Sequence, residues 1–335
     1  MIEYLKRYDQ IWPPAPTFTE TSLPASLADK VYLITGSNSG VGLSLATILY
    51  SKHAKVWIAA RSETKAQAAI ELIRETHPSS TGSLHYLKLE LDDLPAVARA
   101  ARELLAREIR LDVLFNNAGV MHVPQGSVTK QGYELHLGTN NLGHWLFTDM
   151  VTPLLVRTAA NTNQAGSVRV VWLSSLYSYS APRGGMVFDD LEYKKRNAGK
   201  YEKYSVSKAG AWYEASVYAR RHKEDGIVSV AVNPGNLRTD LLRHYPAWQR
   251  WLANTLLLNP IIKGAYSELF AGLSPEITLE KTGAWIIPWG RFGKVRPDLE
   301  RGALPASDDL PGSGLADRWV EWEEQQVSSY KLPPQ

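Results

Sequence analysis

The sequence predicts an α/β fold in which one doubly wound, largely parallel sheet of about seven strands is flanked by helices. Three observations predict it. Short apolar runs alternate with longer segments of helical periodicity. The first run leads into a glycine-rich turn that opens a helix, and small or polar residues directly follow several later runs. In such sheets ligands bind beyond the carboxyl ends of the strands, so the site is expected at that edge.

The strands and helices follow one another without an internal repeat or a domain linker. The length of 335 residues permits one large domain. We expect a lead-in over residues 1–29, the main domain over residues 30–290 and a C-terminal extension over residues 291–335. The expected strands cover residues 31–34, 55–61, 84–91, 111–115, 168–173, 227–232 and 284–287. The expected helices cover residues 43–50, 63–76, 94–109, 132–156, 204–223 and 316–330, with further helices between 240 and 280.

Composition excludes several classes of function. The net charge is +3 with both signs mixed throughout, so no nucleic-acid partner is expected. The chain has no cysteine, which excludes disulfides, thiolate catalysis and cysteine-bound metals, and no metal site is predicted. The N-terminus lacks the apolar core of a signal peptide, and no stretch is long enough for a membrane span. We expect a cytoplasmic protein. The lipophilic segment 248–262 is interpreted as a buried or pocket-lining helix pair, with peripheral membrane contact as the alternative.

The turn after the first strand carries Gly36, Gly40 and Gly42 and leads into a helix. Backbone N–H groups and the helix dipole at such a turn face the pyrophosphate of a dinucleotide. Many glycine turns are only turns, but this one stands between a strand and a helix, where the binding role requires it. The turn therefore predicts a dinucleotide site.

The end of the second strand bears on which dinucleotide binds. An acidic residue there would hold the ribose 2′-hydroxyl and favour NAD. This strand ends at Arg61, with Lys65 one turn further on, and two cations can bind a 2′-phosphate. The pattern favours NADP(H); the alternative is a solvated helix start.

Tyr204 and Lys208 stand four residues apart at the start of an expected helix, so their side chains share one face. A cation beside a phenol favours phenolate and lowers its pKa. A phenol tuned in this way can exchange a proton during carbonyl and alcohol chemistry. The spacing alone is common on ordinary helix surfaces.

Six motifs now stand in order: the glycine turn, residues 116–119, Asn140, Ser175, the pair Tyr204 and Lys208, and residues 233–235 with Thr239. Together they resemble the short-chain dehydrogenase/reductase family over about residues 29–290. Within it the chain is similar to the retinol-dehydrogenase-like branch, closest to fungal light-induced alcohol dehydrogenase-type members. The resemblance implies a Rossmann domain that includes substrate-binding helices over residues 236–280.

The resemblance also implies roles. Tyr204 would be the acid in reduction and the base in oxidation, and Lys208 would lower its pKa and bind the nicotinamide ribose. Ser175 would polarise the carbonyl, with Ser174 as the competing choice, and Asn140 would hold a relay water, with Asn141 as its rival. The implied cofactor-binding residues are Gly36, Asn38, Ser39, Gly40, Val41, Gly42, Arg61, Lys65, Glu90, Leu91, Asn117, Ala118, Gly119, Tyr204, Lys208, Pro234, Gly235, Leu237 and Thr239.

One position departs from the family pattern. The family's third strand usually ends in an aspartate that contacts the adenine amine. Here Glu90 stands at that position, or the role slips to Asp92.

Aromatic residues favour a large apolar substrate. The chain has eleven tryptophans. Those expected near the substrate side, together with two tyrosines, are Trp145, Trp172, Tyr177, Tyr179, Trp212, Trp248 and Trp251. We expect a lipophilic ketone or alcohol, polycyclic or aromatic, as in secondary metabolism, with the long segment 176–203 overhanging the site. Two alternatives are a non-redox dehydratase, isomerase or cyclase on the same scaffold, and a nucleotide-binding protein without turnover. Monomer and homodimer both stay open.

Overall fold

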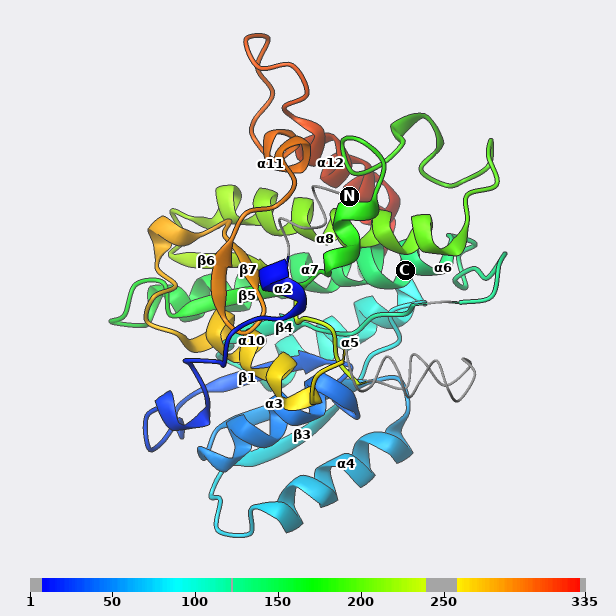
Figure 1. The fold of residues 1–335 in the computed structure, drawn as a ribbon. Coiled ribbons are helices and arrows are strands. Elements are labelled where there is room, and N and C mark those ends of the chain that lie inside the picture. The colour runs from blue at the N-terminus through cyan, green and yellow to red at the C-terminus, as the bar shows by residue number, and fades with distance from the viewer. Residues whose placement is uncertain (1–7, 122, 239–257, 332–335) are drawn as a thin grey trace.

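The computed structural model describes residues 8–121, 123–238 and 258–331 (Figure 1). Its centre is one eight-stranded sheet in the order β3-β2-β1-β4-β5-β6-β7-β8. The strands are β1 (Val31–Thr35), β2 (Lys55–Ala60), β3 (Ser83–Lys88), β4 (Val113–Asn116), β5 (Val168–Leu173), β6 (Ile227–Val232), β7 (Trp285–Ile287) and β8 (Arg291–Gly293). The predicted α/β sheet flanked by helices is confirmed.

The strand count is a correction, since eight strands replace the expected seven. The last strand, β8, pairs antiparallel with β7, whereas all other neighbours are parallel. It has three residues, none fully buried, so no apolar run announces it. Because β8 lies beyond residue 290, the C-terminal extension completes the sheet.

The order of the strands reverses at β1, which pairs with β2 on one side and with β4 on the other. The glycine turn leaves β1 at this point. A crevice opens beyond the carboxyl ends of parallel strands where their order reverses, and ligands of doubly wound sheets bind there. The fold therefore brings the turn to the place where a dinucleotide site is expected.

Helices cover both faces of the sheet (Figure 1). One apolar core lies beneath α3 (Gly40–Ser51), α4 (Glu63–Thr76) and α10 (Ile261–Leu273). The other lies beneath α5 (Leu94–Arg107), α7 (Gly143–Ala160), α8 (Lys200–His222) and the terminal α12 (Leu315–Lys331). Burial on both faces explains why β1, β4 and β6 are apolar almost throughout.

The expected helix over residues 132–156 is interrupted. It begins as the short α6 (Leu135–Leu137), continues as a π-helical turn, η2 (Gly138–Leu142), and becomes regular only in α7. Single π-turns inside helices often occur at functional sites. Periodicity alone does not distinguish such a turn from an α-helix, so the sequence predicted one continuous helix.

The smaller elements lie in the segments expected to be irregular. The lead-in forms α2 (Tyr8–Ile11) and η1 (Glu20–Ser22), although no regular structure was predicted there. The long segment after β5 contains only η3 (Leu176–Ser180) and η4 (Phe188–Asp190) before α8. The remaining elements are η6 (Leu279–Lys281) and α11 (Pro297–Gly302). Of the helices expected between 240 and 280, α10 is present, and residues 239–257 lie outside the described residues.

Within the described ranges, no helix is both long and apolar enough to cross a membrane.

Candidate active site

The backbone of the glycine turn is partly exposed beside the carboxyl end of β1. Gly36 and Gly40 have φ values of +69° and +60°, a region that side chains disfavour. A Cβ on Gly36 would lie 3.0 Å from Ala118, and one on Gly42 would lie 2.6 Å from Asn117 Nδ2. A Cβ on Gly40 would meet nothing within 4 Å, so its backbone faces open space at the start of α3. This arrangement fits a pyrophosphate.

A cavity of about 210 Å³ continues from the turn along the sheet edge. Six of the predicted cofactor residues line it: Gly36, Asn38, Arg61, Leu91, Ala118 and Gly119. Asp92, the alternative to Glu90, also lines it, and seven lining residues were not predicted: Thr35, Ala59, Ala60, Leu89, Val120, Leu135 and Thr139. Most are apolar or small residues at strand ends, which carry no chemical signal of their own.

A carboxylate that the end of the second strand did not predict lies beside Arg61. Its side chain is 74% exposed and lies 3.8 Å from the carboxylate of Asp92, which lines the same cavity. A carboxylate therefore does stand near the position predicted for a 2′-phosphate. Lys65 is exposed in the first turn of α4 and does not line the cavity.

Glu90 is turned to other partners. Hydrogen bonds from Lys130 and Lys88 hold the pKa of Glu90 below its usual value, with N–O distances of 3.1 and 3.2 Å. Glu90 does not line the cavity, whereas Asp92 does. The geometry favours the alternative in which the role of the third strand's carboxylate slips to Asp92.

Tyr204 lies in the second turn of α8, 8% exposed, with its hydroxyl hydrogen-bonded to Ser175. Burial raises its pKa well above the usual value, and the Ser175 bond only partly opposes this. The sequence predicted a lowered pKa. The prediction is wrong for the protein alone because desolvation of the buried phenolate outweighs every favourable contact.

Lys208 is also buried and is held at the end of β5. Its Nζ donates to the carbonyl of Leu173 at 2.7 Å and lies 5.7 Å from the centre of the Tyr204 ring. Burial lowers the pKa of Lys208 to about 8, although Glu214 and Glu268 act in the opposite direction. The amine is thus bound to the end of β5 and is only partly charged at mildly alkaline pH.

Asn140 belongs to the π-turn and is fixed by three bonds. Its Oδ1 accepts from Val120 N at 2.8 Å, and its Nδ2 donates to Val120 O at 3.1 Å and to Ser207 Oγ at 3.0 Å. A Cβ on Gly119 would lie 3.3 Å from Asn140 Oδ1 and 3.5 Å from Lys208 Nζ. Asn140, Gly119 and Lys208 therefore converge on one small space.

The two competing choices point elsewhere. Ser174 is buried and donates to the backbone carbonyl of Lys208 at 2.6 Å, whereas Ser175 faces Tyr204. Asn141 donates to Ser207 O at 3.0 Å and to Glu214 at 2.7 Å, on the side of α8 away from the phenol.

His144 was not among the predicted site residues, but it contacts two parts of the site. Its Nε2 lies 3.0 Å from Thr35 Oγ1 and its Nδ1 lies 3.1 Å from Asn140 O. Burial lowers the pKa of His144 to about 4, so the ring is neutral. It connects the end of β1 to the π-turn. Its place one turn after Asn140 was the available signal.

The predicted residues after β6 lie at the far side of the turn. Gly235 has a φ of +87°, and its N–H donates to Asn233 at 3.1 Å. Leu237 packs close to Gly264 of α10, where a side chain would collide with it, and Val41 lines the same contact. Pro234 precedes this turn, and Ser39 is the N-cap of α3. Thr239 lies outside the described residues.

A second cavity, of about 370 Å³, opens beside α8 beneath the long segment. It is lined by Tyr177, Ser180, Pro182, Tyr201, Glu202 and Ser205. The ring of Tyr177 packs edge-on against Tyr204 at 5.4 Å, so this cavity adjoins the phenol.

Most of the aromatic residues expected at the substrate lie elsewhere. Trp145, Trp172 and Trp212 are in the apolar core, and Tyr179 binds the carbonyl of Lys294. Trp248 and Trp251 lie outside the described residues. The count of tryptophans therefore reflected the core, and the aromatic wall of the second cavity is made by tyrosines.

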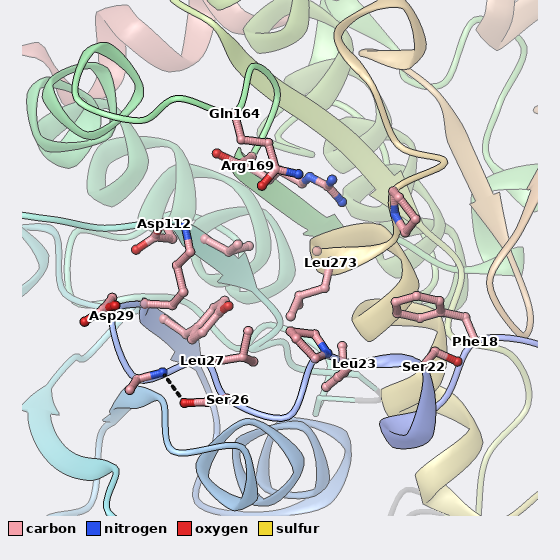
Figure 2. Close-up of a pocket in the computed structure, with 18 residues that line it drawn as sticks. Phe18, Ser22, Leu23, Ser26, Leu27, Asp29, Asp112, Gln164, Arg169 and Leu273 are labelled. Carbon is pink, nitrogen blue, oxygen red and sulfur yellow. Dashed lines mark hydrogen bonds and ion pairs between the residues drawn. The ribbon is translucent and has the colours of Figure 1, made fainter.

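A larger cavity, of about 530 Å³, lies at the opposite edge of the sheet, between the lead-in and the end of α10 (Figure 2). None of the predicted catalytic residues lines it. Arg169, seen in its wall, is buried and donates to four backbone carbonyls, those of Gly166, Ala271, Ser274 and Ile277. This arginine ties α10 to β5. The predicted catalytic residues lie at the carboxyl ends of the strands instead.

Comparison with known proteins gives consistent results. A family model described as short chain dehydrogenase matches residues 30–189. A protein of Phomopsis amygdali named short-chain dehydrogenase/reductase is 48% identical over 325 residues, which cover 96% of each chain. The short-chain dehydrogenase/reductase pkfC of Emericella nidulans is 41% identical over 318 residues, covering 94% of this chain and 97% of the relative.

Solved structures share the fold. An uncharacterised protein from Mycobacterium Paratuberculosis superposes with a TM-score of 0.66 at 26% identity, covering 95% of this chain and 99% of that one. The Pseudomonas aeruginosa RhlG/NADP active-site complex superposes with a TM-score of 0.60 at 22% identity, covering 78% and 95%.

Proposed function

The chain belongs to the short-chain dehydrogenase/reductase family and is an NAD(P)-dependent oxidoreductase; we propose that it uses NADP(H) to interconvert a lipophilic ketone and its alcohol. The observation that carries this proposal is the meeting of Tyr204, Ser175 and Lys208 beside the glycine turn. The tyrosine hydroxyl is bonded to Ser175, and Lys208 Nζ lies 5.7 Å from the tyrosine ring.

These residues divide the reaction between them. The nicotinamide, when bound, supplies or accepts the hydride at the carbonyl carbon. In reduction the hydroxyl of Tyr204 gives its proton to the carbonyl oxygen as the C=O π bond breaks, so the product carries one new C–H and one new O–H bond. Ser175 donates a hydrogen bond to the same oxygen and stabilises its developing charge. In oxidation the proton returns to Tyr204.

The raised pKa of Tyr204 suits the reductive direction. A buried phenol keeps its proton throughout the neutral range and can act as the acid. When Tyr204 gives up this proton it becomes negatively charged, and the nearby Lys208 ammonium stabilises that charge. Asn140 holds the water of the proton relay near Lys208. Its Oδ1 borders the space next to Gly119.

The cavity beneath the long segment supports an aromatic or polycyclic substrate. Its volume of about 370 Å³ lies within the range of small-molecule pockets. Tyr177, Tyr201 and Pro182 provide flat apolar walls, and Ser205 and Glu202 provide polar points. Because the chain resembles the fungal light-induced alcohol dehydrogenase type, we also propose a role in secondary metabolism.

Arg61 supports NADP(H). It lies at the rim of the cofactor cavity, and its exposed guanidinium can reach a 2′-phosphate. Among structural relatives, RhlG and a gluconate 5-dehydrogenase of Beutenbergia cavernae contain NADP, whereas a Brucella melitensis reductase contains NADH. The fold therefore accepts both dinucleotides, and the choice falls to residues such as Arg61.

The rest of the proposal concerns the setting of the site. We place it in one domain over residues 30–290, whose substrate-binding helices fall within residues 236–280. We propose a cytoplasmic enzyme with a small-molecule substrate and no nucleic-acid partner, as a monomer or a homodimer, with peripheral membrane contact through residues 248–262 as the alternative.

A carbonyl panel tests the proposal. The purified protein is incubated with NADPH or NADH and with ketones that range from polycyclic aromatic to small sugar-like compounds, and absorbance of the reduced nicotinamide is followed. We expect oxidation of NADPH with the aromatic ketones and little with the sugars. Turnover of sugars alone, or consumption of a ketone without loss of the nicotinamide absorbance, would contradict it.

A further inference from the structure

A pair of buried carboxyl groups lies between α8 and α12. Glu214 of α8 and Glu323 of α12 are both fully buried, and the two carboxyl groups lie close enough for each to act on the pKa of the other. Glu214 Oε1 accepts from Asn141 Nδ2 at 2.7 Å. None of the described residues outside the pair donates to Glu214 Oε2 or to either oxygen of Glu323.

Three of the four carboxyl oxygens have no hydrogen-bond donor among the described residues. If both groups were ionised, two buried charges would therefore stand largely unpaired, so one of the two groups carries a proton. Two charges here would also be buried at close range, which is strongly unfavourable. The pair therefore holds a shared proton when α12 is docked, as in other carboxyl dyads.

The pair is joined to the π-turn through short contacts. Asn141 donates to both Glu214 and Ser207 O, and the next side chain, Asn140, donates to Ser207 Oγ. Gly210 makes this approach feasible, since a Cβ there would lie 2.7 Å from Asn141 Nδ2 and 2.8 Å from the Trp319 ring. Both α12 and the π-turn therefore pack against α8 at Gly210, where no side chain intervenes.

We propose that Glu214 and Glu323 are positioning residues whose shared proton fastens α12 to α8 and to the π-turn, and so holds Asn140 in its place in the active site. The proposal rests on the function proposed above, because Asn140 is assigned to that site. It gives the C-terminal helix a role in the reaction although no residue of α12 lines either active-site cavity.

The sign of the pH effect follows from burial. Burial raises the pKa of both carboxyl groups above their value in an unfolded chain. The docked state therefore binds protons more strongly than the undocked state, and its stability is lost as pH rises through the folded pKa values. Docking of α12 should weaken at alkaline pH, not at acid pH.

Four groups outside the pair act on its protonation. Asn141 of the π-turn, Lys208 of α8 and the indole of Trp319 in α12 favour the ionised form of Glu214. Also from α12, Glu324 disfavours ionisation of Glu323. Burial outweighs the three groups that favour ionisation, so the pKa of each carboxyl group stays raised.

Other charged groups on the surrounding helices have partners outside the pair. Glu324 is bound by Arg221 at 2.6 Å. From the two helices on the other sides, Arg102 of α5 binds Tyr330 O, and Asp149 of α7 binds Lys331.

The test compares the full-length protein with three variants. In Glu323→Gln the amide supplies the missing donor permanently, in Glu323→Ala it is lost, and in Glu321→Gln the same charge is removed from an exposed position of the same helix. Hydrogen exchange of residues 138–142 and 315–331, corrected for intrinsic rates, is measured from pH 6 to pH 10, together with kcat and the KM for NADPH.

In the unaltered protein and in Glu321→Gln, protection of both segments should fall together in the alkaline range, and kcat should fall with little change in KM. In Glu323→Gln the fall in protection should move up by about one pH unit or more, or disappear. Glu323→Ala should lack protection at every pH and lose about tenfold or more in kcat. If Glu323→Gln and Glu321→Gln have the same exchange profile, the inference is overturned. If exchange behaves as expected but no ketone is reduced, the proposed function fails while the proton-held docking of α12 stands.

Discussion

Two buried cations stand at opposite ends of the central strand β5, and their surroundings differ. Arg169 at the amino end and Lys208 at the carboxyl end are each 4% exposed. Arg169 gives its N–H groups to four backbone carbonyls and fastens the end of α10. Among the described residues, Lys208 donates to one carbonyl only, that of Leu173.

The difference separates structure from function. A guanidinium that is almost fully hydrogen-bonded has little left to offer a ligand and contributes to stability. An amine with one acceptor keeps donors free, and burial lowers its pKa to about 8. A buried polar group whose hydrogen-bond donors are not all paired lowers stability, but its free donors can interact with a ligand.

The largest expected effect concerns the phenol next to Lys208. Tyr204→Phe removes the proton donor and leaves the packing against Tyr177 intact. Reduction should fall by about 10²–10⁴-fold, the usual contribution of a general acid. Binding of NADPH, measured by fluorescence titration, should be retained. A variant that still turns over at the original rate would remove Tyr204 from the reaction.

The comparison of the two cations predicts opposite outcomes for their replacement. Arg169→Met leaves four carbonyls without their donor and should cost about 3–5 kcal/mol of unfolding free energy. Lys208→Met should abolish most activity but leave stability unchanged or higher, because it removes a poorly solvated amine. Urea denaturation measures both, with Arg99→Met, at an exposed position, as the control. Equal losses of stability in the two variants would contradict the distinction.

The pKa of Lys208 predicts a pH profile. Its ammonium form is present below about pH 8 and is lost above it, so kcat/KM for reduction should decline through that range. Lys208→Arg retains a positive charge and should move the decline to higher pH at a lower maximum rate. A profile of kcat/KM that stays flat up to pH 10 would show that this charge is not required.

The smallest effect is expected at the exposed rim of the site. Arg61→Ala should weaken NADPH binding by about tenfold and NADH binding by less, since only NADPH carries the 2′-phosphate. Asp92→Asn removes the carboxylate 3.8 Å from Arg61 and should have the opposite effect on NADPH. Equal changes in both cofactors after Arg61→Ala would leave NADP(H) preference without support.

Much of the fold could be predicted because its signals are local. The limits of β5, β6 and α4 agree with those expected from the sequence, as apolar runs and helical periodicity do not depend on distant contacts. The three-residue β8 and the π-turn could not be predicted. The first is a strand only because β7 lies beside it, and the second has the same apolar spacing as a regular helix.

The site followed the same division. The family resemblance carried by the order of the motifs predicted one site with Tyr204, Lys208, Ser175 and Asn140, and these residues lie close together in the structure. The sequence could not show how far each side chain is buried or which way it points. Tyr204 has a raised pKa because its surroundings are dry, Glu90 is turned toward Lys130, and Trp145 and Trp172 stack in the core. Each outcome depends on packing between segments far apart in the chain.

In the proposed reaction, NADPH supplies hydride to a carbonyl carbon while Tyr204 provides the proton. The most direct measurement uses NADPH deuterated at the transferred position, an aromatic ketone that the enzyme consumes, and mass spectrometry of the product. We expect one deuterium on the carbinol carbon with the unaltered protein and almost no labelled product with Tyr204→Phe. A product that forms at the normal rate without deuterium would contradict it.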